Sequence, residues 1–347
     1  MDWRHPWTVS RSVRELVMAK PPFPWIGSKE KLAPYILPAF PPKLRQYVEP
    51  FGGSGAVLLA LPPDSNRLDI YNDLDSELVN LFSCIKERTN VLMRELKFLP
   101  IQSRTLFEYY RDFVAHKDVY YQNIQEEIAC LGDRSCFTEE QAGELLPIFK
   151  ERLRLYDVKR AAAFYKAIRG SFSGTVTSYG VKGVDIEHFL GLFPAVSERL
   201  KDVPLENKNA LQLIRERDRK GGLIYSDPPY VTTEKIYRVS RNIRTIRRIR
   251  HFHVRLWQVL SQCKGYIVVS YNDCPFIRKL YQDYYILAFR RNNPLSQKKG
   301  AEFGELIITN YDPEPYLNRQ MSLFDGQLGD LELKVIHRPD RPIKYHS

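Results

Sequence analysis

A glycine-rich turn between a short strand and a short helix constrains the fold of this chain more than any other feature. Residues 46–48 are typical of a strand, residues 51–55 form the turn, and the apolar residues 56–61 continue as a helix. Residues 67–71 alternate like a second strand, and residues 76–86 have helical spacing. This order predicts an α/β fold with a mostly parallel sheet.

The rhythm of strands and helices stops and later resumes. Residues 87–168 carry long helical patterns, and residues 169–185 are rich in Gly, Ser and Thr, which makes a hairpin plausible. Further apolar strands are expected from about residue 203 onward, in one sheet with the first two, at 222–225, 265–270 and 305–309. Beyond Asp312 the charged, Pro-rich tail is expected to be poorly ordered.

The glycine turn and an acidic residue beyond it predict a nucleotide site. Glycines allow a sharp turn and close approach of a ligand, and Asp73, 20 residues after Gly53, follows the second strand. Such an acid accepts hydrogen bonds from ribose hydroxyls. A tight turn without a ligand and a helix N-cap, for which Asp75 is the better placed, are the plain alternatives. These residues leave open a nucleoside cofactor or a dinucleotide.

A second motif, Asp227-Pro228-Pro229-Tyr230, follows the strand at 222–225. Ligands of open α/β sheets bind at the carboxyl ends of strands. The prolines fix the backbone, so that Asp227 and the Pro228 carbonyl can both accept from an exocyclic amino group while Tyr230 stacks on a base. The motif predicts a pocket for a flipped nucleobase.

Composition bounds the partners. The net charge of +11 favours a polyanion, foremost a nucleic acid. No apolar run reaches the ~20 residues of a membrane span, and the N-terminus lacks the pattern of a signal peptide, so we expect a cytoplasmic, nucleoid-associated protein without membrane contact. Five widely spaced cysteines favour neither disulfides nor zinc, and we expect no metal.

The motifs together resemble those of the Dam-type (D12 class) adenine-N6-specific DNA methyltransferases, over about residues 22–313. Residues 25–29 are similar to the family's N-terminal motif, 49–55 to its glycine motif, 227–230 to its catalytic motif and 270–273 to the motif after the next strand. The resemblance implies a Rossmann-like methyltransferase fold that uses S-adenosylmethionine and carries a helical target-recognition insert with a β-hairpin. The implied segments are a cofactor-binding part at 20–86, the insert at 87–185, a second catalytic part at 186–313 and a flexible basic tail at 314–347.

The resemblance also implies roles for single residues. Lys29 is expected to pair with the cofactor carboxylate, and Asn209 stands where many members have an Asp for the cofactor's adenine. The catalytic residues implied are Asp227, Pro228, Pro229 and Tyr230. The cofactor-binding residues implied are Trp25, Gly27, Lys29, Glu49, Phe51, Gly53, Gly55, Asp73, Asn209 and Asp227.

Double-stranded DNA is the expected partner, and two segments are expected to contact it. One is the hairpin, and the other is a run from Lys235 to Arg255 that no acidic residue interrupts. The candidate contacts are Arg169, Ser171, Ser173, Arg238, Arg241, Arg244, Arg247 and Arg248.

A short motif in the tail resembles the one with which bacterial proteins bind the sliding clamp. Gln320 is expected to bond at the rim of the clamp's pocket, and Leu323 and Phe324 to be the buried anchors. An apolar clasp on the catalytic domain is the alternative.

Two other functions are weighed. A cytosine-N4 or RNA methyltransferase is disfavoured by Asp227, because cytosine enzymes more often carry Ser at that position. A non-catalytic DNA-binding protein with a relict cofactor fold is disfavoured by the intact motif at 227–230.

The basic run gives a test in salt titrations. Neutralising Arg244, Arg247 and Arg248 together is expected to weaken DNA binding on every sequence and to flatten the slope of log affinity against log salt, because phosphate contacts release counterions. Binding isotherms at several salt concentrations measure this slope. A loss confined to one target sequence would instead place these arginines at base edges.

Overall fold

A computed structural model describes residues 19–97, 103–133, 135–153, 157–171, 176, 178–180, 189–230, 246–292, 302–320 and 333–340. Its described part contains one mixed sheet with the strand order β3-β2-β1-β4-β5-β7-β6-β8. The strands are β1 Gln46–Glu49, β2 Leu68–Asn72, β3 Leu205–Glu206, β4 Gly222–Ser226, β5 Tyr266–Asn272, β6 Tyr285–Asn292, β7 Glu302–Thr309 and β8 Leu333–His337. The expected α/β fold is confirmed, and strands before and after the insert share this sheet.

The order of the strands creates a topological switch point at β1. Neighbouring strands from β3 to β5 are parallel, whereas β7, β6 and β8 are antiparallel to their neighbours. From β1 the chain builds outward through β2 and β3, then returns to the other side of β1 with β4 and β5. A crevice at the carboxyl ends of β1 and β4 is the expected ligand site of such a sheet.

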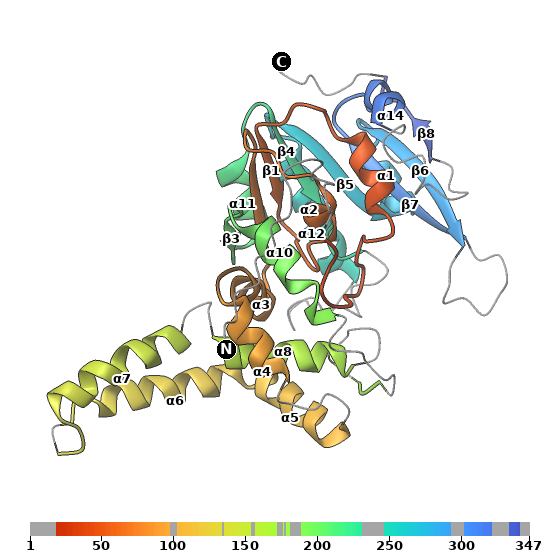
Figure 1. Ribbon diagram of the computed structural model, residues 1–347. Helices are drawn as coiled ribbons and strands as arrows, with labels where there is room; N and C mark the ends of the chain where they lie inside the picture. The colour runs from red at the N-terminus through yellow and green to blue at the C-terminus, as the bar shows by residue number, and fades with distance from the viewer. Residues whose placement is uncertain are drawn as a thin grey trace, which may run out of the picture.

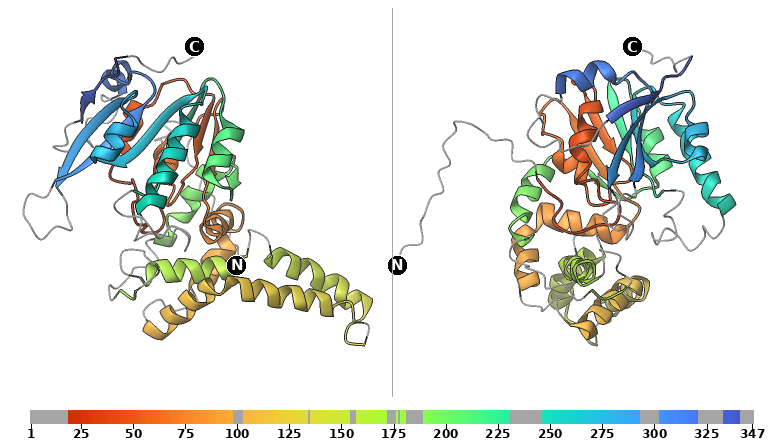
Figure 2. Two further views of the ribbon diagram at one scale, coloured as in Figure 1. Left: turned by 180° about the vertical axis from the view of Figure 1, so that it is seen from behind. Right: turned by 90° about the vertical axis from the view of Figure 1, so that its right-hand side faces the viewer.

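Helices cover both faces of the sheet, as Figures 1 and 2 show. Alternate strand residues enter two separate hydrophobic clusters: Tyr47 and Leu223 face one, and Val48 and Ile224 face the other. The first cluster includes residues of α1 Ala33–Ile36, α2 Ala56–Ala60, α3 Ser76–Glu87 and α10 Phe193–Leu200. The second includes residues of α11 Ala210–Arg217, α12 Ile246–Leu260 and α13 Pro275–Leu280. None of the helices in the described ranges is long and apolar enough to span a bilayer.

In Figure 1 the helical insert lies below the sheet, on the side where the parallel strands end. It contains α4 Thr89–Lys97, α5 Arg104–Ala115, α6 Lys117–Cys130, α7 Glu139–Arg152 and α8 Val158–Arg169. The α6 and α7 helices lie side by side and project away from the sheet (Figure 1). Helix α8 is almost wholly buried, and its Arg160 forms an ion pair of 2.9 Å with Glu77 of α3.

The tail differs from expectation. Residues beyond Asp312 form α14 Glu314–Gln320 and strand β8, which pairs with β6 as an edge of the sheet. The expectation of poor order is therefore wrong for these two elements. Gln320 ends α14, and Leu323 and Phe324 lie outside the described residues.

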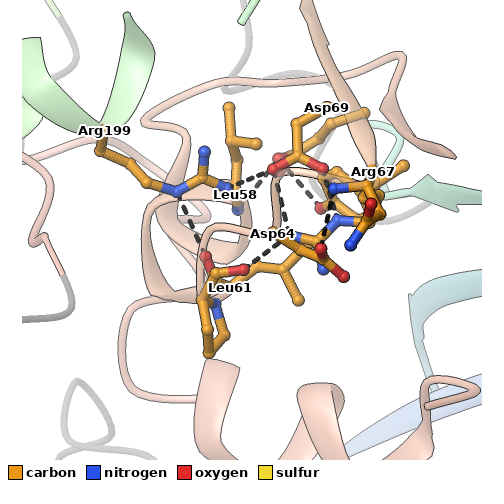
Figure 3. A network of polar contacts seen from close by, with 10 residues as sticks. Leu58, Leu61, Asp64, Arg67, Asp69 and Arg199 are labelled. Atoms are coloured by element: carbon orange, nitrogen blue, oxygen red, sulfur yellow. Dashed lines mark hydrogen bonds and ion pairs between the residues drawn. The ribbon is translucent and has the colours of Figure 1, made fainter. Parts of the chain in front are cut away.

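A buried polar network ties the two sides of the insert together (Figure 3). Asp69 on β2 accepts from Arg67 at 2.6 Å and from Arg199 of α10 at 2.7 Å. Arg199 also donates to the carbonyl of Leu61. Because the side chains of Arg67, Asp69 and Arg199 are each less than a tenth exposed, the carboxylate neutralises charge that water does not reach.

We therefore expect Asp69→Ala to lower the free energy of unfolding by ~3–5 kcal/mol, because two buried guanidinium groups lose their partner. Urea unfolding measures this change. The matched control is Asp64→Ala, which removes an exposed carboxylate from the turn before β2. Equal effects of both substitutions would contradict the structural role of the network.

Candidate active site

The glycine loop after β1 is shaped by three glycines with different functions. A Cβ on Gly52 would lie 2.2 Å from the ring of Tyr71, so no side chain fits there. Gly53 and Gly55 have φ of +51° and +66°, in the left-handed region that favours glycine. The Tyr71 hydroxyl donates to the Gly53 carbonyl at 2.7 Å, which holds the loop against β2.

The side chain of Glu49 holds the start of α2, directly after the glycine loop, in place. Gly55 is the N-cap of α2 and has no side chain, so the Glu49 carboxylate, from the end of β1, accepts from the backbone N–H of Leu58 at 3.1 Å. The same oxygen accepts from the Tyr47 hydroxyl at 3.1 Å. Burial raises the pKa of Glu49 to about 8, and the charge of Asp227 adds to this rise.

Asp73 closes the loop from the side of β2. One carboxylate oxygen accepts from the Gly53 N–H at 2.9 Å, and the other accepts from the Asp75 N–H at 2.8 Å. Burial raises the pKa of Asp73 to about 6. Asp75 caps α3 by accepting from Glu77, as expected for the helix start, so Asp73 is left to face the loop.

The loop after β3 is joined to the same place. The buried Asn72 side chain donates to the carbonyls of Pro50 and Lys208 and accepts from the Lys208 N–H. Asn209 follows and is exposed. Its side-chain Oδ1 caps α11 by accepting from the backbone N–H of Leu211 at 3.0 Å. Asn209 thus lies beside the loop after β1, with one acceptor position already in use.

Asp227 follows β4, the strand that pairs with β1. Its Oδ2 forms an ion pair of 2.7 Å with Lys29. Its Oδ1 is buried and accepts no hydrogen bond from any described residue. Burial raises the pKa of Asp227, while the Lys29 charge opposes the rise. The site therefore contains a buried acceptor that awaits a donor.

Tyr230 forms an aromatic wall next to this carboxylate. The Lys29 ammonium lies 4.8 Å from the centre of its ring, and its hydroxyl donates to Glu305 at 2.8 Å. The ring of Tyr271 lies 6.1 Å away. Sequence reasoning missed Glu305, because only the antiparallel register of β7 on β5, which sets Glu305 opposite Asn272, carries it to the site.

The segment 25–29 packs between the two loops. Trp25 lies against Gly53, and Ser54 donates to the Ser28 hydroxyl at 2.9 Å. Gly27 has φ of +76°, and its carbonyl accepts from Lys29 at 2.9 Å. The structure thus brings Lys29 to Asp227, on the catalytic side, whereas the resemblance implied a partner on the cofactor.

The structure describes only some of the residues that are expected to contact DNA. The Arg169 guanidinium stacks 3.6 Å from the centre of the Phe189 ring. Ser171 is buried, and its hydroxyl donates to the Ile168 carbonyl at 2.7 Å. Ser171 and Tyr179 form an antiparallel bridge where the hairpin was expected. Ser173, Arg238, Arg241 and Arg244 lie outside the described residues, and Arg247 and Arg248 lie on α12.

Taken together, the site offers a glycine loop with an acid beside it, a buried carboxylate oxygen without a donor, and an aromatic ring. Among the described residues, no group of three or more His, Cys, Asp or Glu side chains could hold a metal ion. Oxygen acceptors beside an aromatic face suit an amino-bearing base. The fold is that of a Rossmann-like methyltransferase.

Comparison with known proteins gives the family. The chain belongs to the D12 class N6 adenine-specific DNA methyltransferases, whose profile matches residues 25–292. It is 25% identical over 308 residues to the Type II methyltransferase M1.LlaDCHI of Lactococcus lactis subsp. cremoris, covering 83% of this chain and 94% of that protein. It is also 31% identical over 120 residues to the DNA adenine methylase of Haemophilus influenzae, covering 33% and 41% respectively.

The resemblance drawn from the motifs is confirmed. The chain is a DNA methyltransferase that methylates N6 of adenine, which decides against the cytosine-N4 and RNA alternatives and against a non-catalytic protein.

Glu49 gives a prediction for the pH dependence of stability. Its pKa in the folded chain, about 8, lies above the value near 4.5 in the unfolded chain. Its contribution is therefore full below pH ~4.5 and is lost as pH rises through about 8, at up to ~1.4 kcal/mol per pH unit. We expect Glu49→Gln, which keeps an acceptor for Tyr47 and Leu58, to reduce this decline.

Urea unfolding between pH 5 and pH 8.5 measures the decline in both proteins. The control Glu108→Gln changes an exposed carboxylate and is expected to follow the wild type. A parallel pH profile for Glu49→Gln would show that Glu49 is ionised in the folded state throughout this range.

Proposed function

We propose that the methyl donor is S-adenosylmethionine and that Asp227, with the Pro228 carbonyl, holds the amino group of an adenine flipped out of the duplex. The observation that carries this proposal is the buried Oδ1 of Asp227, which lacks a donor among the described residues. An exocyclic amino group has two N–H donors, one for each of two acceptors. Tyr230 supplies a ring on which the same base can stack.

The donor, when bound, supplies an electrophilic methyl group. The adenine amino group is a weak nucleophile because its lone pair is delocalised into the ring. Hydrogen bonds to Asp227 and to the Pro228 carbonyl favour a pyramidal nitrogen, whose lone pair is directed at the methyl group. The chain thus contributes orientation and electrostatics, and the proton leaves the nitrogen after transfer.

Lys29 favours the ionised form of Asp227, which is the form that accepts hydrogen bonds through both oxygens. Burial alone favours a neutral Asp227, and the ammonium at 2.7 Å favours the ionised form. The ammonium also lies over the ring of Tyr230, so it occupies the region where a stacked base is expected. We propose that the base takes this position and that its amino group donates to Oδ1 of Asp227, which lacks a donor among the described residues.

The residues of the glycine loop fit a nucleoside cofactor. The Asp73 carboxylate accepts backbone hydrogen bonds from Gly53 and Asp75, and its oxygens have further lone pairs that can accept from a ribose hydroxyl. The bare backbone of Gly53, below Trp25, permits close approach of a ligand. The proposed contacts are Trp25, Gly27, Phe51, Gly53, Gly55, Asp73 and Asn209, whereas Glu49 acts by shaping the loop.

The finer partner assignments remain proposals. The basic run after Tyr230 continues into α12, where Arg250 and Arg255 are exposed, which supports phosphate contact beside the base pocket. The relative named a Type II methyltransferase supports a role in restriction-modification. Binding to a sliding clamp through Gln320, Leu323 and Phe324 rests on the sequence motif alone.

Asp227 provides the direct test. Asp227→Ala is expected to retain DNA binding and to lose methyl transfer by at least ~10²-fold, because an acceptor of the nucleophile is removed. Transfer of labelled methyl groups to DNA measures the rate. Asp202→Ala, which removes an exposed carboxylate elsewhere in the chain, is the control. A folded Asp227→Ala protein with a rate near that of the wild type would overturn the assignment.

A further inference from the structure

Helix α12 contacts the glycine loop and the end of β5 through two neighbouring residues. The ring of Phe252 lies 6.3 Å from that of Phe51 in the glycine loop, at an interplanar angle of 87°. The next residue, His253, is fully buried, and its Nδ1 lies 2.8 Å from the hydroxyl oxygen of Tyr271. One helical turn thus touches the loop after β1 and the end of β5.

The contact at β5 leads on to the base pocket. Tyr271 is fully buried, and its ring lies 6.1 Å from that of Tyr230. The hydrogen bond between His253 and the Tyr271 hydroxyl holds the end of the Tyr271 side chain in place. Since the rings of Tyr271 and Tyr230 are neighbours, this bond helps to position the ring against which Tyr230 lies.

Packing alone does not explain a histidine at this position. A buried imidazole loses hydration, and this cost is offset only when its nitrogens have partners. A phenylalanine would fill the same space between Phe252 and Tyr271 without that cost. The bond between His253 and Tyr271 therefore has a function that apolar packing does not supply.

The outer face of α12 is basic. Arg250 and Arg255 are exposed, and the helix continues the basic run that follows Tyr230. Phosphate contacts on this face would act on a helix whose inner face contacts the glycine loop and the end of β5.

We propose that Phe252 and His253 are positioning residues that couple α12 to the two halves of the active site, Phe252 to the cofactor loop and His253, through Tyr271, to Tyr230. The inference rests on the proposed stacking role of Tyr230. It predicts that Phe252 affects cofactor binding, whereas its neighbour His253 affects capture of the flipped base.

Four variants separate cofactor binding from capture of the base. Tyr271→Phe removes only the hydroxyl, His253→Phe removes the partner with similar volume, and His253→Asn keeps a polar group near the place of Nδ1. Phe252→Leu keeps an apolar side chain but removes the edge-to-face contact with Phe51. Gln258→Ala, at an exposed position of α12, is the control.

The measurements are the kcat and KM of methyl transfer, the affinity for S-adenosylmethionine by calorimetry, and the fluorescence of 2-aminopurine placed at the target adenine. The target sequence is first found by sequencing DNA methylated by the wild type. 2-Aminopurine reports the flipped base, because its fluorescence rises when it leaves the stack.

For Tyr271→Phe and His253→Phe we expect kcat and the fluorescence rise to fall about five- to tenfold with unchanged cofactor affinity, as for one lost hydrogen bond. The two changes combined are expected to cost no more than either alone, and His253→Asn to recover part of the loss. Phe252→Leu is expected to weaken cofactor binding about three- to tenfold and to leave the fluorescence of the bound base unchanged.

Wild-type fluorescence and cofactor affinity for Tyr271→Phe, or equal effects of all variants on both readouts, would overturn the proposal. Should His253→Phe fail to fold, Tyr271→Phe and His253→Asn decide the matter. Asp227→Ala and Tyr230→Ala distinguish failure of the positioning role from failure of the proposed function. If these two substitutions abolish transfer or base capture while Tyr271→Phe has no effect, only the positioning role is wrong. If they too have no effect, the proposed function itself is wrong.

Discussion

The parallel pairing of β1 with β4 is the constraint on which the site depends. The chain leaves β1 in one direction across the sheet and returns on the other side with β4, so the loops after these two strands meet at one edge. Glu49 and Asp227 end up close enough for the charge of Asp227 to raise the pKa of Glu49. The segment 25–29 packs into this junction and contacts both loops.

Local patterns were sufficient for the elements around the glycine loop. The structure confirms β1, α2, β2 and α3 where periodicity and turn residues predicted them. Strand β3 has only two residues and no periodicity, and β8 exists by pairing with β6 at the edge of the sheet. The antiparallel insertion of β7 between β5 and β6 is set by contacts between distant segments, which no local pattern records.

The site shows the same division. Residue types and spacing identified Asp73 and the motif at 227–230, because each follows a strand at the end where ligands bind. Partners across the fold were not accessible in this way: the bond from Tyr230 to Glu305 depends on the register of β7, and Lys29 meets Asp227 only after folding. The bond from the Ser171 hydroxyl to the Ile168 carbonyl was not predicted either, because a pattern of serines does not show which backbone groups lie near them.

The three buried acids at the junction of the two loops differ in how their burial is compensated. Burial raises the pKa of Glu49, Asp73 and Asp227, so each carboxylate lowers stability near neutral pH relative to its protonated form. Glu49 and Asp73 are compensated by backbone donors of the glycine loop, which gain a fixed geometry in return. Asp227 differs, because one of its oxygens bonds to Lys29 and the other has no donor among the described residues. The Oδ1 of Asp227 is therefore the acceptor to which the proposed amino group of the substrate can donate.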